Sequence, residues 1–124
     1  MNILIDTHIF LYLANGDLNK LKPKHLQILE DINNKIYLSS ISIAEISIKV
    51  SINKLKFEGN ILRVLDDMDI EVLEFDAKSA ILLKDLPYYH KEPFDRMIIS
   101  QAIANKLKII TYDEKFKFYD CQII

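Results

Sequence analysis

Four acidic residues of this 124-residue chain have the type and placement that metal chemistry requires: Asp6, Glu45, Asp95 and Asp113. Carboxylates gathered in one place repel one another, by about 4 kcal/mol for a pair 4 Å apart at an effective dielectric constant near 20. A native cluster of this kind therefore usually needs a cation. Carboxylate oxygens are the hard ligands that Mg²⁺ or Mn²⁺ takes, together with waters and substrate phosphates. We therefore expect a divalent-metal site that hydrolyses phosphodiesters.

Two of these acids follow short apolar segments that we expect to be buried strands. Asp6 comes directly after residues 2–5, and Asp113 comes shortly after residues 108–111. In open α/β sheets, ligands bind outside the carboxyl ends of the strands. Two acids from opposite ends of the chain are therefore expected to meet at one edge of a sheet.

The other two acids, Glu45 and Asp95, are expected to reach the same edge from helices. Asp95 lies in the first turn of a helix that Pro93 opens, where the helix dipole favours an acid. Residues 40–55 contain β-branched side chains in partial alternation, which locally favours a strand. A segment of this length without a breaker is long for a strand and ordinary for a helix. We therefore expect a helix with Glu45 about one turn inside it.

Strands and helices are expected to alternate along the chain. The remaining expected strands cover residues 36–39, 70–75 and 122–124, and the remaining expected helices cover residues 6–14, 23–33, 60–68, 76–87, 93–106 and a short stretch from 113. Such alternation predicts an α/β fold with a mostly parallel sheet between helices on both faces. The length suits a single domain over residues 1–124.

The composition excludes several common chemistries. Gly16 and Gly59 are the only glycines, so neither a Rossmann G-x-G-x-x-G nor a P-loop is present. The usual zinc patterns are also absent, because Cys121 is alone and the three histidines are scattered.

The same composition favours a cytoplasmic protein. A lone cysteine suits a reducing compartment, and the chain shows neither a signal peptide nor an apolar run near the roughly 20 residues of a membrane helix. The net charge of −2 argues against a protein that coats nucleic acid, although it permits an enzyme with a local basic patch.

Each acid also has an ordinary structural explanation. Asp6 and Asp113 could serve only as helix N-caps. Glu45 could form a surface pair with Lys49 at spacing i,i+4, and Asp95 could simply complement its helix dipole. The joint pattern carries more weight than any single residue, because these helix N-termini are expected to share one edge of the sheet.

Several neighbours of the acids are candidates for supporting roles. Lys49 and Arg96 could contact a substrate phosphate or could balance the acids through salt bridges. Thr7, next to Asp6, could help to begin its helix. His90 is expected to be a loop or cap residue and not a general base.

Four short motifs in order give the chain a family resemblance. Leu-Ile-Asp-Thr at residues 4–7, Ser-x-x-x-x-Glu at 40–45, Pro-Phe-Asp-Arg at 93–96 and Thr-x-Asp at 111–113 resemble PIN-domain proteins. More narrowly, they resemble the VapC-type toxins of bacterial toxin–antitoxin modules. The resemblance extends from Ile3 to Phe116. Residues 90–96 also match a subgroup pattern, His-x-Asp-Pro-Phe-Asp-Arg, except that Glu92 replaces its first Asp; the role of Glu92 is left open.

This resemblance implies a fold, an activity and partners. It implies a three-layer sandwich around a five-stranded, mostly parallel sheet, and a Mg²⁺- or Mn²⁺-dependent endoribonuclease. Thr111 would hydrogen-bond within the site, and the metal would be bound by an acidic quartet: Asp6, Glu45, Asp95 and Asp113. The partners would be RNA, an antitoxin whose C-terminal segment covers the site, and a second copy in a homodimer.

Two other classes of function stay open at this point. One is a PIN-fold module that binds nucleic acid or protein without cleaving it. The other is an aspartate-based phosphotransfer domain, which also places acids after parallel strands, although Asp6-Thr7-His8 lacks the second Asp of an Asp-x-Asp motif.

Overall fold

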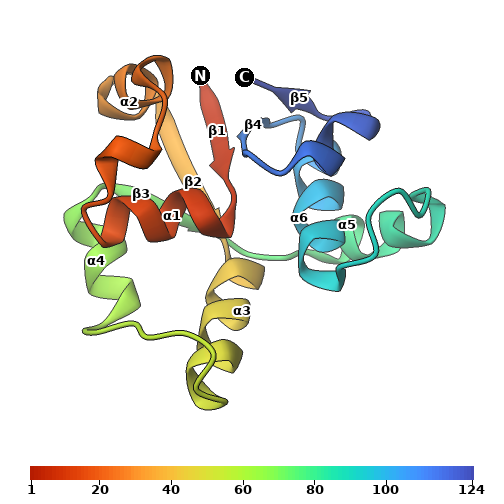
Figure 1. Cartoon of the computed structure of the whole chain (residues 1–124). Coiled ribbons are helices and arrows are strands. Elements are labelled where there is room, and N and C mark those ends of the chain that lie inside the picture. Colours follow the sequence, from red (N-terminus) through yellow and green to blue (C-terminus); the bar gives the residue numbers. More distant parts are fainter.

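In a computed structural model, which describes residues 1–124, strands and helices alternate around one sheet (Figure 1). The strands are β1 (Asn2–Ile5), β2 (Lys35–Ser39), β3 (Ile70–Leu73), β4 (Lys108–Ile110) and β5 (Gln122–Ile123). The α-helices are α1 (Thr7–Ala14), α2 (Pro23–Glu30), α3 (Ser40–Ser51), α4 (Ile61–Asp67), α5 (Ala77–Leu82) and α6 (Pro93–Ala104), and the 3₁₀ helices are η1 (Leu18–Lys20), η2 (Leu83–Asp85) and η3 (Glu114–Phe118).

The five strands form one fully parallel sheet in the order β3-β2-β1-β4-β5. β1 lies at the centre, where Ile5 is in register with Leu38 of β2 and with Ile110 of β4. Because the strands are parallel, their carboxyl ends share one edge. The residues that follow β1, β2 and β4 therefore start from neighbouring positions.

Helices cover both faces of the sheet and make three layers (Figure 1). In β1, Ile3 and Ile5 pack into the core under α1, α2 and α4, whereas Leu4 packs into the core under α6. All three side chains are completely buried. Such a strand, buried on both faces, is typical of parallel sheets. It anchors the backbone from which Asp6 projects.

Side-chain caps begin the helices that carry the candidate site. Asp6 accepts a hydrogen bond from the Ile9 N–H at 2.9 Å and starts α1 directly after β1. Glu92 accepts one from the Asp95 N–H at 2.7 Å, and Pro93 takes the tolerated first position of α6. These caps place the first turns of both helices at the carboxyl edge of the sheet.

The expected fold class, an α/β sandwich with a five-stranded parallel sheet, is confirmed. Residues 40–55 do form a helix, but it ends at Ser51, shortly before Asn53 takes a positive φ of 59°. The strand expected over 70–75 ends at Leu73 because the next backbone groups bond to side chains instead of a neighbouring strand.

Two of the expected helices are shorter than predicted. The segment 23–33 is helical only to Glu30, and a turn in which the Asp31 carboxylate accepts from the Asn33 N–H follows it. The segment 76–87 divides into α5 and η2. No helix of the chain has the length and apolar character needed to cross a membrane.

Candidate metal and catalytic site

Asp6 is buried at the carboxyl end of β1, with 4% of its surface exposed. One carboxylate oxygen caps α1 through the Ile9 N–H, and the other accepts the Thr111 hydroxyl at 2.5 Å. Burial raises the pKa of Asp6 above its usual value, and these hydrogen bonds oppose that shift only in part. The carboxylate is therefore held in one orientation, and its ionised form is destabilised.

Thr111 connects the ends of the two central strands. Its hydroxyl donates to Asp6, and the same oxygen accepts the Asp113 N–H at 3.0 Å. The hydroxyl thus links two acids that are far apart in the sequence. This is the position in which the family resemblance placed a hydrogen-bonding threonine.

Glu45 reaches the site from α3 and is held at both oxygens. The Thr7 hydroxyl lies 2.8 Å from Glu45 Oε1 and 2.8 Å from the Ser42 hydroxyl, and Lys49 Nζ lies 2.7 Å from Glu45 Oε2. Glu45 is only 5% exposed, whereas the Lys49 side chain is 42% exposed, so the pair joins a buried carboxylate to an ammonium at the surface. The hydrogen bond to Glu45 raises the pKa of Lys49, and the nearby charges of Glu92 and Asp95 raise it further.

Asp95 projects from the first turn of α6, and about a quarter of its side chain is exposed. Burial raises its pKa to about 7, and the negative charges of Glu92, Glu45 and Asp113 contribute to the shift. His90 acts in the opposite direction. The raised pKa of Asp95 therefore reflects, in part, the repulsion between its charge and those of the neighbouring acids.

Asp113 caps η3 and is the most exposed of the four acids, with about a third of its side chain accessible. Burial raises its pKa, but the Lys115 N–H and the His90 ring outweigh that effect, so the net shift is downward. Asp113 therefore carries a stable negative charge beside Asp95, whose charge is unfavourable.

His90 completes the cluster, although the sequence pointed only to a loop or cap residue. Its Nε2 lies 2.8 Å from Asp113 and 3.1 Å from Asp95, and the residue is 6% exposed. One ligand atom from each of these three residues lies within 4.8 Å of the other two. Its fixed place in the motif at residues 90–96 was the one available signal.

Hydrogen bonds and charge interactions thus connect all four predicted acids. Asp6 is joined to Asp113 through Thr111, and Asp113 to Asp95 through His90. Glu45 influences the pKa of Asp95 through its charge. An oxygen-rich, partly open set of acids in which two pKa values are raised by burial suits a hard divalent cation, which would favour the ionised carboxylates.

Arg96 does not take either of the roles predicted from the sequence. It is 6% exposed and forms no salt bridge with any acid. Its guanidinium donates to the Tyr119 hydroxyl and to four backbone carbonyls, those of Leu83, Leu86, Pro87 and His90. The prediction of a phosphate contact or a carboxylate pair is therefore corrected. The guanidinium of Arg96 instead holds the loop that precedes α6 in place through these hydrogen bonds.

Two polar clefts open beside the acids. The first, here called the β4 cleft, has a volume of about 460 Å³ and includes Thr111 and Asp113, with Lys22, Lys24, Tyr112 and Lys117 along its walls. The second, here called the α1–α3 cleft, has a volume of about 240 Å³ and includes Thr7 and Glu45, with His8, Lys49 and Lys54 beside them. Members of the acidic cluster therefore face cation-bearing clefts on two sides.

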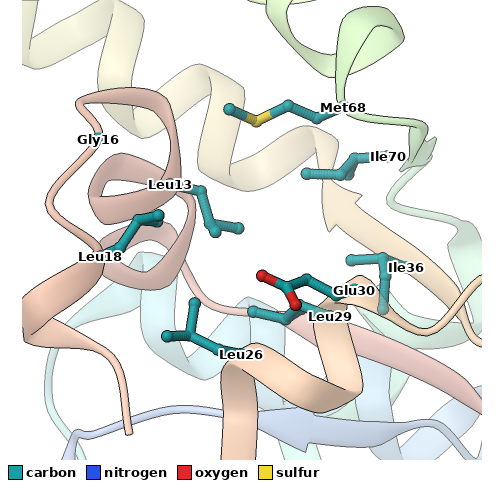
Figure 2. Close-up of a pocket in the computed structure, with 9 residues that line it drawn as sticks. All are labelled: Leu13, Gly16, Leu18, Leu26, Leu29, Glu30, Ile36, Met68 and Ile70. Carbon is teal, nitrogen blue, oxygen red and sulfur yellow. The ribbon is translucent and has the colours of Figure 1, made fainter. Parts of the chain in front are cut away.

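A third hollow is apolar and lies away from the acids, among α1, α2, β2 and the start of β3 (Figure 2). Figure 2 shows the side chains of Leu13, Leu26, Leu29 and Met68 around a common space, with the Glu30 carboxylate beside them. Its volume is about 320 Å³. This hollow is called the apolar groove below.

The fold and this acidic edge define a class of α/β proteins with carboxylates at the end of a parallel sheet. The chain belongs to the PIN domain family, whose pattern matches residues 3–120. A comparison with curated protein sequences found no match.

Solved structures share the fold over nearly the whole chain. VapBC2 from Rickettsia felis, bound to a DNA fragment from its promoter, has a TM-score of 0.74 at 24% identity, covering 100% of this chain and 98% of that one. VapBC from Salmonella typhimurium, bound to DNA, has a TM-score of 0.65 at 20% identity, covering 100% and 97%. FitAcB from Neisseria gonorrhoeae has a TM-score of 0.61 at 22% identity, covering 98% and 96%. The VapC-type resemblance predicted from the motifs is thus matched by the fold.

The raised pKa of Asp95 predicts how the stability of the metal-free protein depends on pH. Because the folded state holds this proton up to about pH 7 and the unfolded state only to about 3.8, stability falls as pH rises between those values. In EDTA, the Asp95→Asn variant is expected to have a higher melting temperature than the wild type at pH 8. This difference should disappear near pH 4. Thermal melts at several pH values measure this. A difference that does not change with pH would contradict it, and Asp67→Asn, an exposed residue of α4, is the control.

Proposed function

We propose that this protein is a Mg²⁺- or Mn²⁺-dependent endoribonuclease that acts as the toxin of a toxin–antitoxin pair. The observation that carries the proposal is the convergence of four acids, from four separate elements, at the carboxyl edge of one parallel sheet: Asp6, Glu45, Asp95 and Asp113. Membership of the PIN domain family supports the same chemistry.

Asp6 and Asp95 are the proposed principal ligands, and Asp113 joins them directly or through water. Asp95 Oδ1 accepts no hydrogen bond from the protein, whereas its Oδ2 faces His90. Both oxygens of Asp6 are held by hydrogen bonds, which fix the direction of their remaining lone pairs. A divalent cation supplies charge that stabilises the phosphate and makes water more acidic.

Glu45 is proposed to bind the cation and to orient the attacking water. Thr7 and Lys49 each hold one of its oxygens, so its position does not depend on the substrate. The Lys49 ammonium also lies close enough to Asp95 and Glu92 for their charges to raise its pKa. It thereby keeps one positive charge beside the acids, where a scissile phosphate would lie.

The β4 cleft is proposed to hold the RNA strand next to the acids. Its lining includes Thr111 and Asp113, so a strand in this cleft passes directly beside the cluster. Lys22 lies over the Tyr112 ring, with its Nζ 5.3 Å from the ring centre, and Lys24 forms no ion pair. A groove with two lysines that form no ion pair and with an aromatic wall suits single-stranded nucleic acid, which pairs phosphates with cations and stacks its bases.

The apolar groove is proposed to bind an apolar segment of the antitoxin. Structures of VapBC complexes share this fold, and seven of the nine residues that line the groove are hydrophobic. Leu18 at the groove is 45% exposed and Met68 is 39% exposed, which is costly in water and favourable under a partner. Glu30 forms no ion pair here, so the partner segment is expected to carry a basic residue opposite it. The expected homodimer stays a prediction.

Cleavage of RNA tests the activity. Purified protein is expected to cut RNA with Mn²⁺ or Mg²⁺ and not in EDTA. Asp6→Asn and Asp95→Asn should each lower the rate by at least about a hundredfold, because outer-shell changes alone cost 10–100-fold. Asp67→Asn makes the same chemical change at an exposed site and should cut normally. Equal cleavage by wild type and Asp95→Asn would refute the assigned site, and no cleavage of any cellular RNA would favour a non-catalytic binding module.

RNA binding tests the β4 cleft separately from cleavage. In an Asp95→Asn background, fluorescence anisotropy with single-stranded RNA is measured over a range of salt concentrations. Lys22→Ala and Lys24→Ala should each weaken binding and lower the slope of log K against log salt by about 0.7. Lys78→Ala on α5 serves as the control and should bind like the parent. If all three variants bind alike, the RNA does not lie in this cleft.

Co-expression with the product of the neighbouring gene tests the antitoxin proposal. The two proteins are expected to purify together, and Leu18→Glu should disrupt the complex because it places a charged side chain in the apolar groove, where the apolar segment of the partner would have to bury it. Ile81→Glu changes an apolar residue of α5 that is 63% exposed, and it should leave the complex intact. A complex that survives Leu18→Glu but not Ile81→Glu would place the partner on the opposite face.

A further inference from the structure

His90 is a buried imidazole in contact with two acids of the site. Its Nε2 lies 2.8 Å from Asp113 Oδ2 and 3.1 Å from Asp95 Oδ2. Asp95 and Asp113 come from different elements, α6 and the turn after β4, and nothing else in the structure bridges them. The ring is therefore the side chain that contacts both carboxylates.

The hydrogen bonds of His90 define which nitrogen carries the proton. The Glu92 N–H donates to Nδ1 at 3.2 Å, so Nδ1 is an acceptor. A neutral ring then carries its proton on Nε2, and this N–H donates to Asp113, while Asp95 Oδ2 lies 3.1 Å from the same nitrogen. With the proton there, Nε2 has no lone pair to offer a cation or a water, and the ring acts as a donor to the acids.

The protein holds this imidazole in place from several directions. The His90 backbone N–H donates to the Tyr119 hydroxyl at 2.8 Å, and that hydroxyl donates to the Pro87 carbonyl at 2.6 Å. Arg96 adds hydrogen bonds to the carbonyls of the same loop. The His90 ring also meets the Phe116 ring edge-on at 6.0 Å. Such a fixed ring is suited to orienting other groups.

We propose that His90 is a positioning residue that aims Asp95 and Asp113 at a divalent cation without binding the cation itself. The proposal rests on the proposed function of the site. His90 engages Oδ2 of each acid and leaves Oδ1 of Asp95 free of protein partners. Outer-shell hydrogen bonds of this kind orient metal ligands, and their loss typically costs 10–100-fold in metal affinity or activity.

Mn²⁺ binding, measured by calorimetry on the purified full chain, tests the proposal without reference to cleavage. His90→Leu removes the donor and is expected to weaken Mn²⁺ binding by about 10–100-fold. His90→Gln keeps an N–H donor on a side chain of similar reach, so it should recover most of the affinity. His25→Leu removes the other buried imidazole, which bonds to Tyr112 and the Ile124 carbonyl, and should bind Mn²⁺ like the wild type.

Pulsed electron paramagnetic resonance on the Mn²⁺ complex distinguishes an orienting role from direct ligation. No nitrogen coupling from a bound imidazole is expected in the wild type. Such a coupling, or unchanged Mn²⁺ affinity in His90→Leu, would overturn the positioning role while leaving the nuclease proposal intact. A wild-type protein that binds no Mn²⁺ would overturn the proposed function and the role of His90 together.

Discussion

The repulsion among carboxylates at the carboxyl edge of the sheet is the constraint on which the rest of the site depends. The parallel sheet places the ends of β1, β2 and β4 side by side, so the acids that follow these strands lie close together. Lys49 is the one lysine or arginine paired with the quartet. The remaining charge is held by hydrogen bonds from Thr7, Thr111, His90 and backbone N–H groups, and burial keeps water from screening it.

The structural and chemical roles of the acids are not alternatives. Asp6 caps α1 with one oxygen and meets Thr111 with the other, and Asp113 caps η3 with one oxygen and meets His90 with the other. Each cap fixes the side chain that the site uses. The stability of the helix N-termini and the geometry of the acidic cluster therefore come from the same contacts, so two capping residues can also supply carboxylates to the proposed metal site.

Much of this arrangement was predictable from the sequence, because it depends on local pattern. The apolar run before Asp6, the Pro93 that opens α6 and the Thr-x-Asp motif at residues 111–113 mark the elements that carry the site. A parallel sheet then brings their ends together. Helix ends were less predictable. The helix α3 ends shortly before Asn53, and no pattern in the sequence predicts the positive φ of that residue.

The partners of His90 and Arg96 were not predictable, because they depend on the path of the loop between η2 and α6. His90 meets an acid 23 residues away, and Arg96 folds back onto the carbonyls of residues 83–90. Neither contact follows from periodicity or from spacing along a helix. Arg96 also shows that a basic residue next in sequence to a proposed catalytic acid can serve only to hold the loop in place.

The central claim is that a divalent cation relieves the repulsion within the acidic cluster. The most direct test is the number of protons released when Mn²⁺ binds, measured by calorimetry in buffers of different ionisation enthalpy. Because the metal-free Asp95 has a pKa of about 7 and burial also raises the pKa of Asp6, binding should release about one proton or more near pH 6 and fewer at pH 8. Mn²⁺ binding without proton release at either pH would show that the cation binds elsewhere and would contradict the account.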